Sequence, residues 1–421
     1  MIRSHLSKLV DDFRPDLEPY EKLYRSLHQS PELSLQEGET AAIAAKHLEA
    51  LSGFEVHKNI GGQGLVGILK NGSGMTVLVR ADMDALPVQE QTGLPYSSTK
   101  TMKDVADGVT KPVMHACGHD VHVSCMLAAA ETLHRAQKNW NGTLIVLFQP
   151  NEERAGGAQA MVDDGLYDRI PVPDVVLGQH VMPYRAGSLG TRPGPMMAAA
   201  DSFKITLYGR GGHASQPHRT IDPAVMAAHV VVRLQGIASR EVDPADTVVV
   251  TVGSIQAGMT ENIISDHAIL RINVRTFKPE TRERVLASIR RIIKAESDAS
   301  NAPKDPLIES TTRFPLTIND ENVVGELEQP FSDHFGDRYT RRVDRLPGSE
   351  DFSILATSKN VPYCFWVFGG TDPEKWDKAE KEGRLLEDIP VNHSPFFAPV
   401  IQPTLKTGVD AMSLAVLSFL G

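Results

Sequence analysis

Apolar runs alternate with segments of helical spacing through the first part of the chain. Runs at residues 76–80, 143–148 and 174–178 predict buried strands, and residues 121–137, between the first two, predict a helix. Strands that alternate with helices are typical of α/β proteins with a mostly parallel sheet and helices on both faces. Such sheets bind ligands at the carboxyl ends of their strands, so functional residues are expected there.

The pattern changes after Pro193-Gly194-Pro195, where two strands in succession lie between two helices, as in small α+β domains. The predicted elements are a strand at 203–208, a helix at 223–237, strands at 247–252 and 268–276, and a helix at 281–295. From about residue 311 the first pattern resumes, with a strand at 362–368 and a closing helix at 403–420. We therefore predict a catalytic domain of residues 1–192 and 308–421, with a smaller domain of residues 193–307 inserted into it.

Charge and composition exclude several classes of protein. The 421 residues carry a formal net charge of -10, which disfavours nucleic-acid binding because that interaction needs clustered Lys and Arg. The chain has neither a signal-peptide pattern nor an apolar run of about 18 residues, so we expect no secretion and no membrane span. Three scattered cysteines predict no disulfide framework, which favours a cytoplasmic protein with a thiol free to bind metal.

A thiol and an imidazole stand close together before the first predicted helix. Cys117 and His119 are separated by one glycine, a spacing that lets both side chains reach one ion. Taken alone, such a pair more often serves packing or helix capping than metal binding.

Two adjacent carboxylates follow a fully apolar strand. Glu152 and Glu153 follow a strand expected to be buried, so both carboxylates should lie near the core. In that position one of them can hold a metal while the other accepts a proton. His180 follows the third predicted strand, and His393 comes late in the chain. Together these segments supply sulfur, nitrogen and oxygen ligands from four loops: Cys117, His119, Glu153, His180 and His393.

Several ordered motifs make the chain resemble the amidohydrolase branch of the dinuclear-metal exopeptidases. This branch includes hippurate hydrolase, N-acyl amino acid deacylases and plant auxin-conjugate hydrolases. The resemblance spans nearly the whole chain, and its motifs are residues 25–33, 80–87, 115–120, 149–153, 211–214, 349–352 and 392–394.

The resemblance implies a hydrolase that cleaves the amide bond of an N-acyl amino acid or a similar small, carboxylate-bearing amide. It implies two divalent metal ions, Zn²⁺ or Mn²⁺ with Co²⁺ as a further option, bound by the five ligands above with Cys117 as the bridge. Water activated by the metals would be the nucleophile, and Glu152 would be the general base.

The same resemblance gives roles to the inserted domain, which would close over the site and form a homodimer or a higher homo-oligomer. His213 would stabilise the oxyanion in a neighbouring subunit's site, while Asn262 and Arg275 would hold the substrate carboxylate. The family usually has a proline three residues after that asparagine, where this chain has Ser265. Asp84 is expected either to orient a histidine ligand or to cap a turn.

Two other functions remain compatible with these residues. One is a metallo-carboxypeptidase or dipeptidase acting on short peptides. The other is a metal-dependent small-molecule binding protein without turnover, against which the complete set of ligands and Glu152 argues. Residues 61–64 contain three glycines between strand-like runs and predict a turn instead of a nucleotide-binding loop.

Phe396, Met196 and Met197 are candidates for an acyl pocket or for the core.

Overall fold

The computed structural model describes residues 5–421, which divide into two compact units. Unit 1 contains the described chain up to Gly194, Ile318–Asp344 and Asp351–Gly421, and unit 2 contains Pro195–Thr317 and Arg345–Glu350. Unit 2 thus begins near the expected residue 193 but runs to Thr317. The reason is an unpredicted strand, β15 (Leu307–Phe314), which adds to its sheet.

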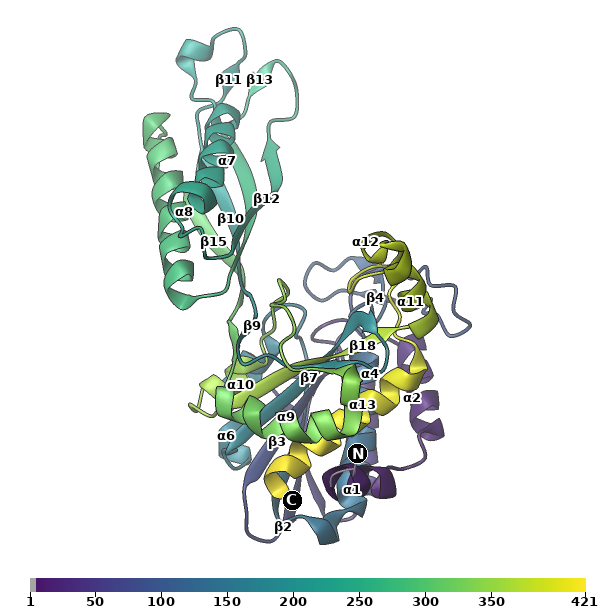
Figure 1. Ribbon diagram of the computed structural model, residues 1–421. Coiled ribbons are helices and arrows are strands. Elements are labelled where there is room, and N and C mark those ends of the chain that lie inside the picture. The colour runs from purple at the N-terminus through teal and green to yellow at the C-terminus, as the bar shows by residue number, and fades with distance from the viewer. Residues whose placement is uncertain (1–4) are drawn as a thin grey trace. The chain divides into compact units, whose positions relative to one another are not determined.

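Unit 1 is built on a mixed sheet in the order β1-β2-β6-β3-β7-β18-β8-β17 (Figure 1). The central strands β6, β3, β7 and β18 are parallel, whereas β2 and β8 run antiparallel to their central neighbours. The predicted α/β class with a mostly parallel sheet is therefore confirmed. The strands are β1 (Phe54–Ile60), β2 (Gly64–Asn71), β3 (Thr76–Asp82), β6 (Gly142–Gln149), β7 (Val175–Arg185), β8 (Leu189–Gly190), β17 (Tyr339–Thr340) and β18 (Tyr363–Thr371).

Helices cover both faces of this sheet. On one face α4 and α13 pack over an apolar core that includes Val77 and Val79 of β3, while α5 and α10 contact β6 and β7 on the other. The helices are α1 (His5–Phe13), α2 (Glu18–Gln29), α3 (Gly38–Ala50), α4 (His119–Arg135), α5 (Gly157–Asp163), α6 (Leu166–Arg169), α9 (Glu321–Phe335), α10 (Ser353–Thr357), α11 (Pro373–Glu382), α12 (Leu385–Asp388) and α13 (Ile401–Leu420). The turn predicted at residues 61–64 is present between β1 and β2 as residues 61–63, and Gly64 begins β2.

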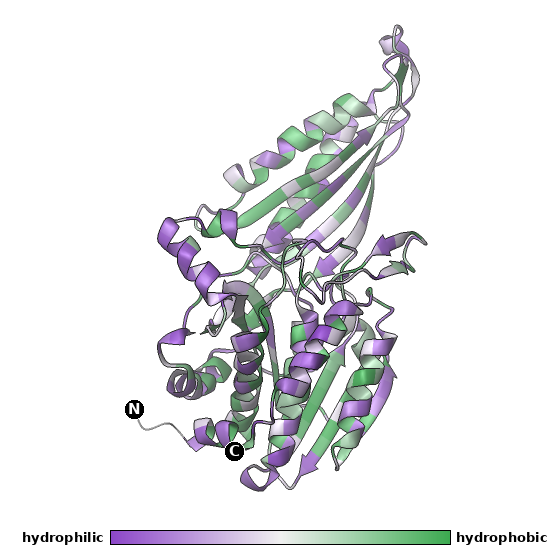
Figure 2. Cartoon of the chain, turned by 90° about the vertical axis from the view of Figure 1, so that its right-hand side faces the viewer, coloured by the Kyte–Doolittle hydropathy of each residue, from purple (hydrophilic) through white to green (hydrophobic). Residues whose placement is uncertain are grey.

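Unit 2 is an antiparallel sheet in the order β12-β14-β10-β15, with two helices on one face. Its elements are β10 (Ala199–Tyr208), α7 (Pro223–Arg240), β12 (Val248–Ala257), β14 (His267–Thr276), α8 (Pro279–Ala299) and β15. Buried and more exposed residues alternate along β14, as expected for a sheet covered on one face. Figure 2 colours the chain by hydropathy, and hydrophobic and hydrophilic bands follow one another along the strands. No helix among residues 5–421 combines the length and apolarity needed to cross a bilayer.

One strand is longer than its sequence pattern predicts. The run 174–178 suggests an end at Gly178, but β7 continues to Arg185 because β18 pairs with it in parallel over that whole length. His180 therefore lies within a strand and is not in the loop after it.

A buried arginine holds the carboxyl ends of β3 and β6 together. Arg80 is fully buried; its Nη1 donates to Asp82 Oδ2 (2.8 Å) and its Nε to Gln149 Oε1 (2.9 Å). Gln149 Nε2 in turn donates to Asp351 Oδ1 at 2.6 Å, and the guanidinium lies 5.9 Å from the centre of the Phe352 ring. Because every member is buried, the network tolerates no unpaired charge.

We predict that Arg80→Met destabilises unit 1 by about 3–5 kcal/mol, because it leaves buried carboxylates without their cation. Chemical denaturation followed by circular dichroism measures the loss. The matched control is Arg185→Met, which removes the surface ion pair with Asp377 (2.6 Å) and should cost about 1 kcal/mol or less. Equal losses in the two variants would contradict this role for Arg80.

Candidate functional site

The five ligands predicted from sequence lie together at the carboxyl end of the parallel strands. Cys117 Sγ is 3.4 Å from His180 Nε2, and Glu153 joins the other two: its Oε1 is 3.9 Å from His119 Nε2 and its Oε2 is 3.3 Å from His393 Nε2. Side chains from four separate segments of unit 1 thus face one small volume.

Backbone carbonyls set the orientation of two of the imidazoles. Nδ1 of His119 lies 2.8 Å from the Asp84 carbonyl oxygen, and Nδ1 of His180 lies 2.7 Å from that of Val181. A carbonyl oxygen can only accept, so each Nδ1 carries a proton. Burial lowers the pKa of His180, whose Nε2 therefore presents a lone pair to the cluster. Burial also lowers the pKa of His119, but the carboxylates of Asp82, Asp84 and Glu153 outweigh it and raise the pKa to about 10, so Nε2 of His119 would offer its lone pair once a cation displaces that proton. Histidines that bind metal through Nε2 are typically held in this way.

Two atoms that face each other across the cluster have ion-pair contacts but lack a hydrogen-bond partner in the described part of the chain, His119 Nε2 lying 3.5 Å from Asp82 Oδ2 and 3.9 Å from Glu153 Oε1. His119 Nε2 and Glu153 Oε1 are both buried, and neither has a hydrogen-bond partner among the described residues. A buried polar atom without a partner is costly, and native structures contain few of them. A divalent cation would satisfy both atoms, so the residues fit a metal centre.

The charges of the cluster also favour a cation. Burial and the nearby Asp84 and Asp82 carboxylates raise the pKa of Glu153 to about 8, although His119 opposes the shift. Burial and the neighbouring glutamates likewise raise the pKa of the Cys117 thiol, whereas burial lowers the pKa of His180 and keeps it neutral. A bound cation would reverse the first two effects and stabilise the carboxylate and the thiolate.

Glu152, the expected base, is buried beside these ligands. A carboxylate oxygen of Glu152 lies within 4.8 Å of ligand atoms of both His119 and Glu153. The Asp84 side chain holds this loop by accepting from the backbone N–H groups of Glu152 (3.1 Å) and Glu153 (3.0 Å). The two alternatives for Asp84 therefore coexist: its carbonyl orients His119, and its carboxylate caps the turn.

His122 is close to the cluster, but both of its ring nitrogens are engaged. Nδ1 lies 2.5 Å from Asp82 Oδ1, and Nε2 accepts from the Val181 N–H at 2.9 Å. Since no lone pair remains, His122 supports the site and does not act as a ligand.

The residue between Cys117 and His119 has to be glycine. Gly118 has a φ of 86°, and a Cβ there would lie 2.5 Å from Val181 Cγ1 of β7. The thiol and the imidazole can therefore approach His180 only because position 118 has no side chain.

Sequence reasoning missed several residues that hold the site. Glu37 accepts from the Asn151 N–H at 2.8 Å and so fixes the loop before Glu152. Asn392, within a motif but without an assigned role, donates from Nδ2 to the carbonyl oxygens of Cys117 (3.3 Å) and Val181 (3.2 Å). The motif containing Asn392 was a signal for that residue, whereas no sequence pattern marks Glu37.

A buried ion triad lies behind the start of α4. His28 Nδ1 is 2.7 Å from Asp120 Oδ2, and its Nε2 is 3.1 Å from Glu90 Oε1. Burial alone lowers the pKa of His28, but the hydrogen bonds and charges of the two carboxylates outweigh it and raise the pKa to about 9. His28 is therefore a cation at neutral pH and joins α2 to the helix that begins with His119.

In unit 2 the three predicted residues do not gather at one place. His213, in β11 (Gly212–His213), pairs with β13 (Ile263–Ile264), and the Ala214 N–H donates to the Asn262 carbonyl oxygen at 3.1 Å. Arg275 lies at the far end of β14, where it donates to Ser349 Oγ at 2.7 Å. Arg275 lies eight residue steps along β14 from His267, which begins the strand, a span of about 27 Å.

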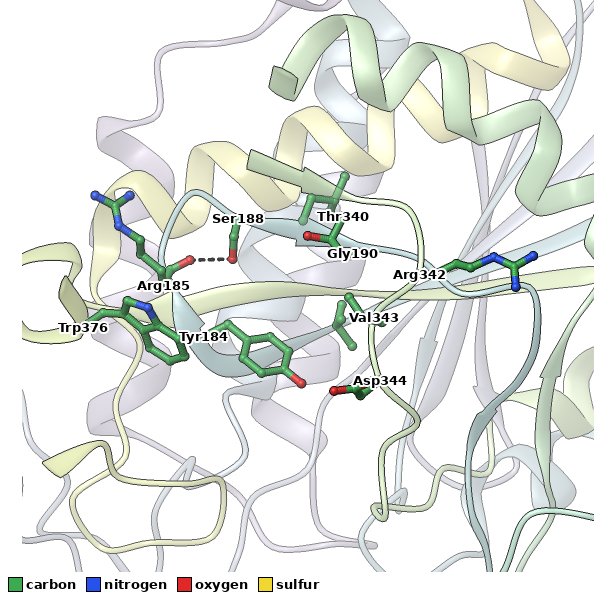
Figure 3. Close-up of a pocket in the computed structure, with 11 residues that line it drawn as sticks. Tyr184, Arg185, Ser188, Gly190, Thr340, Arg342, Val343, Asp344 and Trp376 are labelled. Carbon is green, nitrogen blue, oxygen red and sulfur yellow. Dashed lines mark hydrogen bonds between the residues drawn. The ribbon is translucent and has the colours of Figure 1, made fainter. Parts of the chain in front are cut away.

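A pocket of about 410 Å³ lies beyond His180 on β7 (Figure 3). Tyr184 and Trp376 line it with an edge-to-face ring contact at 6.3 Å, and burial together with Asp344 raises the pKa of Tyr184. None of the five expected ligands lines this pocket. We therefore assign the chemistry to the cluster and not to the pocket.

Comparisons with known proteins identify relatives over most of the chain. The model of Peptidase family M20/M25/M40 matches residues 78–391. A hippurate hydrolase of Campylobacter jejuni is 39% identical over 82% of this chain and 87% of its own length. A thermostable carboxypeptidase 2 of Saccharolobus solfataricus is 32% identical over 98% of this chain and 99% of its own.

Solved structures agree with these relatives. A putative aminohydrolase from methicillin-resistant Staphylococcus aureus has a TM-score of 0.82 at 31% identity and covers 98% of this chain and 99% of its own. A Bacillus subtilis protein described as a dinuclear metal binding peptidase from the M20 family has a TM-score of 0.74 at 26% identity, covering 97% and 98%.

We predict a pH-dependent contribution of His28 to stability. Its pKa is raised from 6.5 to about 9 on folding, so the stabilisation is complete below pH 6.5 and disappears as the pH rises through 9. The difference in denaturation midpoint between the metal-free protein and His28→Gln should therefore shrink over that range. A difference that stays constant with pH would contradict a charged His28.

Proposed function

This chain belongs to Peptidase family M20/M25/M40, and from that premise we propose that it hydrolyses the amide bond of N-acyl amino acids. The observation that carries the proposal is a buried pair of ligand atoms without a hydrogen-bond partner among residues 5–421, His119 Nε2 and Glu153 Oε1, with the Glu152 carboxylate beside them. Amide hydrolysis by water requires a group that takes up a proton and returns it, next to a cation site, and Glu152 beside this pair would meet both needs.

Two divalent ions would be held by the five side chains that face the cluster: Cys117, His119, Glu153, His180 and His393. When bound, the ions supply Lewis acidity toward water and the amide carbonyl. Thiolate, imidazole and carboxylate ligands suit Zn²⁺, Mn²⁺ or Co²⁺, and metal analysis of the purified protein identifies which is present. The likeness to the B. subtilis dinuclear metal binding peptidase supports two ions.

Glu152 would accept the proton of the attacking water and return it to the leaving amine. Two features of the loop support this role. The Glu152 N–H is fixed by Asp84, so the side chain starts from a rigid backbone, and its carboxylate is buried, which excludes bulk water from the proton path.

Peptide hydrolysis is the second candidate, because a relative that covers nearly the whole chain is named a carboxypeptidase. Both substrate classes present an amide and a carboxylate. An activity panel of hippurate, acetyl-amino acids and dipeptides, with added Mn²⁺ or Zn²⁺, separates them. Metal binding without turnover on any substrate would favour a binding protein instead.

The acyl group would contact an exposed aromatic side chain next to His393. Phe396 is 54% exposed, whereas the other two candidates, Met196 and Met197 of β9 (Gly194–Met197), are buried and belong to the core.

The three cysteines are all buried, free thiols, which supports a reducing, cytoplasmic location.

We also propose that His213 and Asn262 complete the active site of a second subunit. The length of β14 supports this, because one substrate cannot contact both ends of a strand that spans about 27 Å. Within a single chain Arg275 and the His213–Asn262 pair would serve different sites. A homodimer in which each unit 2 contributes to the other chain's site uses all three residues at each substrate.

Glu152→Gln should retain its metal and lose most of its turnover, by about 100 to 10,000-fold. The reason is that the side-chain amide of the introduced glutamine cannot accept a proton from water. Steady-state kinetics on the best substrate of the panel, with metal analysis of the same sample, measures both effects. The matched variant Glu153→Gln changes a ligand instead and should lose metal as well. Full activity of Glu152→Gln would remove Glu152 from the role of base.

Mixing two inactive variants tests the sharing of His213 between subunits. His213→Ala and Glu152→Gln, denatured together and refolded, should recover roughly a quarter of wild-type activity, because half of the dimers are mixed and each mixed dimer has one complete site. Each variant refolded alone is the control. No recovery in a mixture proven to contain mixed dimers would mean that His213 acts within its own chain.

A further inference from the structure

Asn392 connects three of the segments that carry expected ligands. Its Nδ2 donates to the carbonyl oxygens of Cys117 and Val181, and it lies 3.8 Å from Cys117 Sγ. Both carbonyl oxygens can only accept, so the pair decides which end of the amide is the NH₂ group. Asn392 thus joins the loop of Cys117 to the strand of His180.

The residue that follows Asn392 is itself an expected ligand, in a strained conformation. His393 has a φ of 70°, in the left-handed region that residues with a side chain rarely adopt. Its N–H donates to the Ala116 carbonyl oxygen at 2.8 Å, and the imidazole is 54% exposed. The side-chain bonds of Asn392 and the backbone N–H bond of His393 therefore fix the backbone from which this partly exposed ring reaches Glu153, 3.3 Å away.

The Val181 carbonyl oxygen is shared between two roles. It accepts from His180 Nδ1 at 2.7 Å and from Asn392 Nδ2 at 3.2 Å. The same oxygen therefore fixes the ring of one histidine and the backbone next to another.

We propose that Asn392 is a positioning residue that holds Cys117, His180 and His393 at the spacing required by two metal ions. This proposal rests on the proposed metal-dependent function and deepens it. Asn392 acts through the three side chains and not on the substrate. Its loss should therefore change metal affinity and turnover, with little change in substrate KM.

A second asparagine provides a matched control. Asn319 Nδ2 also bridges two carbonyl oxygens of unit 1, those of Arg192 (2.9 Å) and Phe365 (2.8 Å), and the residue is buried. Neither carbonyl belongs to an expected ligand or to a residue next to one. Asn319→Ala therefore removes the same kind of bridge from a purely structural place.

The test compares wild type, Asn392→Ala, Asn392→Ser and Asn319→Ala after loading with Co²⁺. Chelator competition gives the affinity, the thiolate-to-Co²⁺ charge-transfer band reports the geometry at Cys117, and kinetics gives kcat and KM. We expect Asn392→Ala to weaken binding by about 10 to 100-fold, to shift or weaken the band and to lower kcat. Asn392→Ser keeps one hydrogen-bond donor, so its metal affinity and kcat should lie between those of wild type and Asn392→Ala. Asn319→Ala should keep the wild-type band and metal affinity while unfolding at a lower temperature.

Wild-type affinity and band in Asn392→Ala would overturn the proposal. So would the failure of both Asn392 variants to fold, because the residue would then serve the fold itself. If the wild-type protein shows no charge-transfer band, the proposed metal site fails, and that outcome is distinct from a failure of the role of Asn392.

Discussion

The concentration of buried carboxylates at one end of the sheet is the constraint on which this site depends. Three carboxylates lie at the carboxyl ends of β3 and β6, next to the apolar core: those of Asp82, Asp84 and Glu153. An unpaired negative charge is energetically costly at such a place. The fold offsets part of that charge with Arg80 on one side and with imidazoles on the other. What remains is a small volume lined by Glu153 and His119, whose best partner is a cation.

This arrangement divides the residues around the cluster into two groups. Both ring nitrogens of His122 and the carboxylate of Asp84 are hydrogen-bonded to neighbouring protein groups. These two residues therefore position the groups around them. His119 and His180 each have Nδ1 engaged by a backbone carbonyl, while Nε2 faces side chains at the cluster. The pattern of hydrogen bonds therefore distinguishes a supporting histidine from an expected ligand, although the two types are indistinguishable in the sequence.

Local patterns predicted the fold class, whereas the set of expected ligands also needed the resemblance of several ordered motifs to a known family. Apolar runs predicted the central strands, and short motifs located Cys117, His119 and the glutamate pair. The length of β7 could not be predicted, because it is set by pairing with β18, which lies far away in the sequence. Glu37 was missed for the same reason: its bond to Asn151 depends on a meeting of distant segments, and no periodicity records it. The separation of Asn262 from Arg275 likewise required the register of β14.

The order of the expected ligands along the chain has a consequence for biosynthesis. Cys117, His119, Glu153 and His180 precede unit 2, whereas His393 follows it. During translation the whole inserted unit is therefore synthesised before the last ligand emerges from the ribosome. A nascent chain that ends before His393 therefore carries only four of the five expected ligands.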